Sequence, residues 1–67
     1  MWTVVYIAPN KAVAERLKIL LATEGFLVDL RMLRFPHVNN ASPVEVLVPE
    51  SEVDEAMEII KYSMIII

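Results

Sequence analysis

Gly25 is the only glycine in the chain, and it directly follows a segment whose apolar residues have helical spacing. Within residues 11–24 these apolar residues recur at steps of four, three and one: Val13, Leu17, Leu20 and Leu21. Such spacing predicts an amphipathic helix with one buried stripe. Helices often end at a residue with a left-handed backbone, which glycine adopts at little cost. The sequence therefore predicts a helix over residues 11–24, with Asn10 as its N-cap and Gly25 as its end.

Three segments have the composition of β-strands: residues 2–7, 26–33 and 44–48. The first is largely apolar at both alternating sets of positions, which is typical of a strand inside a sheet. In the second, one alternating set is predicted to face the core: Phe26, Val28, Leu30 and Met32. In the third, Glu45 and Leu47 are predicted to point outward, while the core-facing set is Val44, Val46 and Val48.

A second helix is predicted from Glu52 to Tyr62. Ser51 and Asp54 resemble a capping box at its start, with Asp in place of the usual Glu or Gln. The expected buried stripe is Val53, Ala56, Met57 and Ile60. Residues 63–67 leave two structures open, because they can form a fourth strand beside the first or extend this helix.

The element order is β-α-β-β-α, in one domain over residues 1–67. A right-handed crossover makes the first two strands parallel, with a gap that the third strand fills in antiparallel orientation. We therefore expect an α+β, ferredoxin-like fold. Its three-stranded sheet has the order 2-3-1, and both helices lie on one face.

The chain is richer in apolar residues than two short helices can cover. It is 57% hydrophobic and contains no cysteine that could form a stabilising disulfide; its mean hydropathy is +0.53. A domain this small is stabilised either by a dense core or by association with another chain. We expect a homodimer, or a complex with another protein, formed through the uncovered sheet face or an open edge. The predicted interface residues are Trp2, Leu27, Leu33, Leu47, Ile65, Ile66 and Ile67.

Charge and composition argue against several other classes of function. A net charge of −3, without a basic stripe, disfavours nucleic-acid binding. The apolar runs are too short to cross a membrane, and the N-terminal segment lacks a basic leader, so we predict a cytoplasmic protein. His37 is the only histidine and there is no cysteine, so no metal site is expected. No other cofactor is predicted. A Ser42–His37–Asp29 set lacks the spacing of a nucleophile elbow, and no catalytic residues are predicted.

Two runs of the sequence resemble a known family. They are "YIAPNKAVAERLKILLATEGF" and "VEVLVPESEVDEAMEII", and together they cover most of the chain. Both are similar to the small prokaryotic signal-transducing protein family, whose members are β-α-β-β-α domains of unknown function. The resemblance implies this fold and a role in signalling, and it brings no catalytic residues to this chain.

The loop after the second strand is the best candidate for a ligand site. Residues 34–42 exceed the usual length of a hairpin loop, and long loops often carry binding residues. Basic and amide side chains could hold a small anionic metabolite there: Arg31, Arg34, His37, Asn39 and Asn40. The alternative is a plain connection whose bends are set by Pro36 and Pro43. The sequence thus predicts a non-enzymatic interaction or regulatory module, with a metabolite sensor as the alternative.

Overall fold

The computed structural model describes residues 1–33 and 42–66, with side chains described for residues 1–33 and 42–63. The elements are β1 (Trp2–Ala8), α1 (Lys11–Thr23), β2 (Asp29–Met32), β3 (Val44–Pro49), a 3-10 turn η1 (Glu50–Glu52) and α2 (Val53–Ile66). This order confirms the predicted β-α-β-β-α, ferredoxin-like α+β fold.

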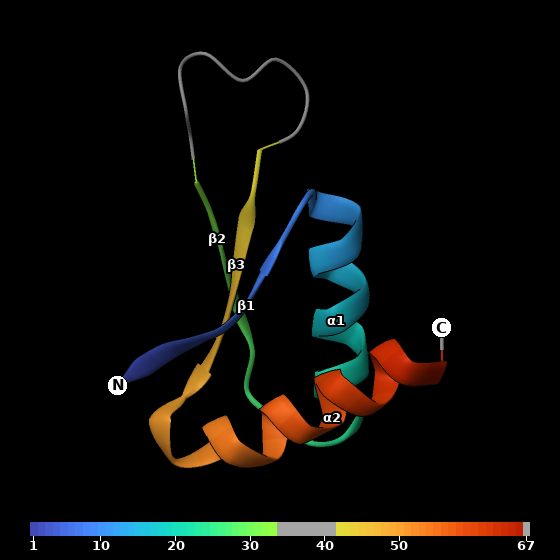
Figure 1. The fold of residues 1–67 in the computed structure, drawn as a ribbon. Helices are drawn as coiled ribbons and strands as arrows, with labels where there is room; N and C mark the ends of the chain where they lie inside the picture. The colour runs from blue at the N-terminus through green and yellow to red at the C-terminus, as the bar shows by residue number, and fades with distance from the viewer. Residues whose placement is uncertain (34–41, 67) are drawn as a thin grey trace.

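The three strands form one sheet in the order β1-β3-β2, and β3 is antiparallel to both neighbours. Both helices lie on the same face of this sheet, as predicted (Figure 1). Among the described residues, nothing covers the opposite face, which we call the open face. β1 lies at the edge of the sheet and is covered on one side only, so the interior position that its composition suggested is wrong.

Of the two structures left open for residues 63–67, the extension of the helix forms: residues 63–66 continue α2, and the described residues contain no fourth strand. Ile65 and Ile66 therefore belong to the last turn of this helix, while Ile67 lies outside the described residues. A run of apolar β-branched residues suits either a strand or a buried helix end, so its composition alone could not decide. Within the described part of the chain, the outer edge of β1 is left without a partner.

Both ends of α1 are held as the sequence predicts. At its start, the Asn10 side-chain oxygen accepts a hydrogen bond of 3.0 Å from the Val13 N–H. At its end, Gly25 has a φ of 95° and its N–H donates to the Ala22 carbonyl at 3.0 Å. The Phe26 N–H donates to the Leu21 carbonyl, also at 3.0 Å. These two bonds form a Schellman motif, which satisfies the last carbonyls of the helix.

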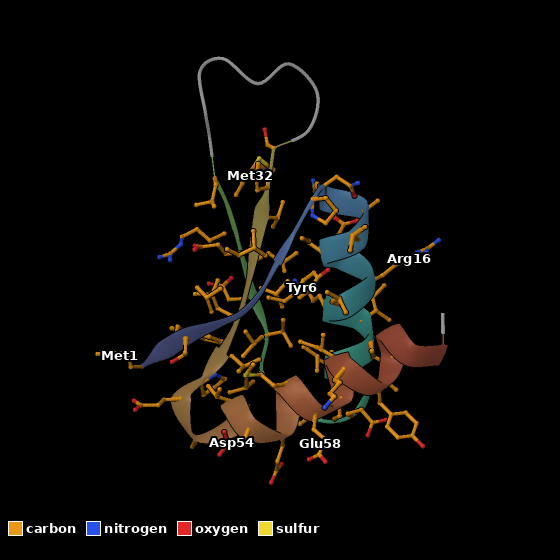
Figure 2. All side chains as sticks on the ribbon, viewed as in Figure 1. Met1, Tyr6, Arg16, Met32, Asp54 and Glu58 are labelled. Atoms are coloured by element: carbon orange, nitrogen blue, oxygen red, sulfur yellow. The ribbon has the colours of Figure 1, made fainter. Side chains whose placement is uncertain are left out.

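The core lies between the sheet and the helices. Its most buried members include Ala14, Leu17, Leu21, Val44, Val46, Val48, Ala56 and Ile60, and Phe26, Val28 and Leu30 pack against them. Two residues that were predicted to lie in the core are instead about half exposed. Met32 is 46% exposed, because it lies at the hairpin end of the sheet, far from α2 (Figure 2). Met57 is 50% exposed, and Ile59 packs on the core in its place.

Two predicted element boundaries also differ. β2 begins at Asp29 instead of residue 26, since the residues just before it close the end of α1 and pack under the sheet. The second helical segment begins as η1, directly after Pro49 and without a side-chain cap. Ser51 lies inside this turn instead of before it, so the predicted capping box is wrong.

Candidate functional site

A β-bulge in β1 determines which side chains reach the open face. Val4 lies opposite Leu47 and Tyr6 lies opposite Val46, so Val5 is the extra residue between two consecutive pairs. A bulge of this kind shifts the alternation of side chains by one position. Residues before and after Val5 therefore follow different alternating patterns.

The shift places apolar side chains on both faces of β1. On the helix side, Val5 and Ala8 are buried, and Tyr6 packs against the core beside α1 (Figure 2). On the open face, Trp2 is 48% exposed and Ile7 is 56% exposed. Ile7 was not predicted as a surface residue of interest. An uninterrupted apolar run carries no mark of where its alternation changes, so the sequence could not show it.

The pairing of the strands defines the remaining open-face positions. They are Trp2, Val4 and Ile7 on β1, Glu45, Leu47 and Pro49 on β3, and Asp29 and Arg31 on β2. Leu47 was predicted to make interface contacts, but it is only 4% exposed. It lies on the central strand between Val4 and Asp29, whose side chains flank it on both sides. Leu47 is therefore covered by its neighbours on the open face and is not accessible to a partner.

The open face has a polar half and an apolar half. On the β2 side, the Arg31 Nε donates to the Glu45 carboxylate at 2.6 Å, and the Asp29 carboxylate accepts from the Leu30 N–H at 3.0 Å. The β1 half has no charged side chain, because none occurs in Trp2–Ala8. A partner that excludes water would therefore meet far less resistance over β1 than over β2.

Leu27 adds to the exposed apolar surface just before β2. It is 65% exposed, while its neighbours Phe26 and Val28 pack on the core. Leu33, also predicted at the interface, is half-buried, and its N–H continues the ladder by donating to the Pro43 carbonyl at 2.9 Å. The side chains of Ile65, Ile66 and Ile67 lie outside those described.

Of the five residues predicted to form the ligand site, the structure describes only Arg31. Arg34, His37, Asn39 and Asn40 lie outside the described residues. Arg31 is described, and its guanidinium already pairs with Glu45 inside the sheet. An anionic ligand would have to share Arg31 with this carboxylate.

The described residues bring no metal-binding chemistry together, since no three His, Cys, Asp or Glu side chains gather as ligands there. Neither described helix is long and apolar enough to cross a membrane. What the described surface offers is an apolar patch on the β1 side of an uncovered sheet.

The chain was compared with protein families, with curated proteins and with solved structures. No family model, no curated protein and no solved structure matches it.

Proposed function

We propose that this chain is a non-enzymatic interaction module that binds another protein chain through the exposed apolar side chains of its open face, which lie on β1 and just before β2. One observation carries the proposal: three large apolar side chains remain about half exposed or more beside an uncovered sheet face. These are Trp2, Ile7 and Leu27. A regulatory role accords with the resemblance of its two long sequence runs to a signal-transducing family.

The size of this surface supports binding. Covering each of the three side chains would remove roughly 100 Å² of apolar surface from water, worth about 2.5 kcal/mol per side chain before the entropy cost of association. Trp2 adds a rigid aromatic group, a type of residue that is enriched where interfaces gain most of their energy. The flanking Arg31–Glu45 pair would form a polar rim.

A pair of matched variants tests the proposal. Leu27→Lys places a charge beside the open face, and Ile19→Lys places the same charge on α1 in the helix layer. The two positions are 65% and 67% exposed, so neither change should unfold the chain. Partners are captured from the native cell with each variant and with the unaltered chain.

The proposal expects one or more partners to be lost with Leu27→Lys and retained with Ile19→Lys. Their direct binding is then measured with purified proteins, where Leu27→Lys should weaken affinity about tenfold or more. An identical set of partners and equal affinities for both variants would contradict the proposal. Loss of partners with Ile19→Lys alone would show that the binding surface lies on the helix layer.

A further inference from the structure

Apart from the bulge at Val5, the free edge of β1 lacks the charges and prolines that normally protect an edge strand. β1 is seven residues long and, between Trp2 and Ala8, contains neither a charged residue nor a proline. The opposite edge strand, β2, is four residues long and carries Asp29 and Arg31. Exposed, uncharged edge strands readily pair with another strand, and short or charged ones resist it. Of the two edges, β1 is therefore the one better suited to pair with another strand.

The backbone groups available at this edge follow from the existing ladder. The Glu50 N–H donates to the Met1 carbonyl at 2.8 Å, so the backbone groups of Met1 point toward β3. In an antiparallel ladder, successive residues point alternately toward and away from the partner. Trp2 and Val4 therefore turn their N–H and C=O groups to the free edge. The bulge at Val5 shifts the alternation, so Ile7 does the same.

We propose that the partner of this edge is the β1 strand of a second copy of the chain. The two strands run antiparallel about a twofold axis, with Val4 of each copy opposite Ile7 of the other. The inference deepens the proposed function, because it names the partner and the register, but it uses the strand edge instead of the exposed side chains around Leu27.

The positions of the side chains select this register. It pairs Val4 with Ile7, both on the open face, and Thr3 with Ala8, both on the helix side. The two residues at the bulge, Val5 and Tyr6, also meet on the helix side. Other twofold registers either oppose side chains from different faces or shorten the pairing to half of this length or less. Val4 and Ile7 are also among the residues whose backbone groups are free, so each such pair can exchange two hydrogen bonds.

A second copy also suits the distribution of charge. Pairing along β1 joins the apolar halves of the two open faces into one surface that contains Trp2, Val4 and Ile7 from both copies. The Arg31–Glu45 pairs then lie outside the new strand contact and keep the exposure that they have in the single chain. Packing the two open faces directly on one another would instead bury these charges, which is costly.

The dimer is expected to be weak and reversible. A single added strand pair buries less than about 1,200 Å², the size range of transient complexes. We therefore expect half of the chains to be dimeric only at about tens of micromolar, in the weak range of affinities.

Disulfide trapping tests both the edge and its register. The natural chain has no cysteine, so Val4→Cys and Ile7→Cys variants each carry one. Residues that form a hydrogen-bonded antiparallel pair have Cα atoms about 5.5 Å apart, which is within the range of a disulfide. Two Val4 residues, one from each copy, would lie three positions apart in this register, or about 10 Å, which is too far. The two variants are given different masses with a tag and oxidised mildly, alone and mixed.

The proposal expects the mixture to form Val4→Cys–Ile7→Cys dimers at least about tenfold faster than either variant alone. Equal rates in all three samples would overturn it, as would the absence of mixed dimers at millimolar protein. A second pair, Ile7→Pro and Ile7→Thr, tests the backbone contribution. Only proline removes the N–H at the free edge, while the ladder to β3 is kept. Ile7→Pro should abolish the dimer and Ile7→Thr should not; equal dimerisation would overturn the proposal.

These outcomes separate the dimer from the proposed function. Loss of partners with Leu27→Lys, together with no mixed disulfide, would support the open face and reject the β1 dimer. Mixed disulfides with an unchanged set of partners would support the dimer and reject the wider role of the open face.

Discussion

The Arg31 Nε lies 2.6 Å from a Glu45 carboxylate oxygen, across the β2–β3 ladder on the open face of the sheet. The Arg31 side chain is 63% exposed, whereas that of Glu45 is 14% exposed. The carboxylate is therefore the member of the pair that depends on its partner. This pair makes the β2 strand polar on the open face, so the exposed apolar side chains lie on β1 and at Leu27, just before β2.

Removing the arginine should cost more stability than removing the charge of the glutamate. Arg31→Met leaves a largely covered carboxylate without its counter-charge, and we expect a loss of about 1 kcal/mol, while Glu45→Gln should cost about half as much. Urea unfolding of both single variants and of the double variant measures the coupling. Coupling that does not shrink in about 1 M NaCl would show that the ion pair is not its source.

Leu47 should contribute to stability although it lies on the uncovered side of the sheet. Leu47→Ala removes a side chain that is 4% exposed, so we expect a loss of about 2–3 kcal/mol in the free energy of unfolding. Leu27→Ala, at a position 65% exposed, should cost less than about 0.5 kcal/mol and serves as the control. Urea denaturation checks both values. Equal costs would mean that Leu47 is not held between its neighbours.

Gly25 should resist replacement for a reason of backbone conformation alone. A Cβ added there would meet nothing within 4 Å, but the φ of 95° is unfavourable for any residue with a side chain. Gly25→Ala should therefore destabilise the fold by about 1 kcal/mol, and Gly25→Asn by less. Thermal unfolding followed by circular dichroism measures both. A neutral alanine variant would contradict the Schellman motif at the end of α1.

Association along β1 should strengthen as salt is added. Each chain carries a net charge of −3, so two copies repel one another, while the contacts at the β1 edge involve no charges. Screening at about 0.5 M NaCl should therefore lower the dimer dissociation constant severalfold. Sedimentation velocity at low and high salt measures the change. Dissociation by salt would instead indicate an interface held by ion pairs such as those of Arg31.

The features that the sequence predicted best are those set by local chemistry. Asn10 and Gly25 mark the two ends of α1. Both could be predicted because a side-chain cap and a left-handed residue depend only on their immediate neighbours. The bulge at Val5 was not predictable, because β1 is apolar on both faces and a shift in alternation leaves its composition unchanged. This shift decides that Ile7 is exposed and that Ala8 is buried. The candidate surface therefore depends on a feature that the pattern of apolar residues could not show.

The low exposure of Leu47 could not be predicted from the sequence for a different reason. Alternation correctly placed Leu47 away from the helices, but its exposure depends on side chains from the two neighbouring strands. Val4 and Asp29 reach it only once the strand order and register are known. The side of a strand can be predicted from its own sequence, whereas solvent exposure on a central strand cannot.

Sedimentation equilibrium of the unaltered chain tests the central claim most directly. Between about 5 and 500 μM, a span that brackets weak interfaces, the mean mass should rise from 7.6 kDa toward twice that value. The Ile7→Pro variant should stay at 7.6 kDa over the same span. A mass of 7.6 kDa for the unaltered chain at every concentration would contradict the account.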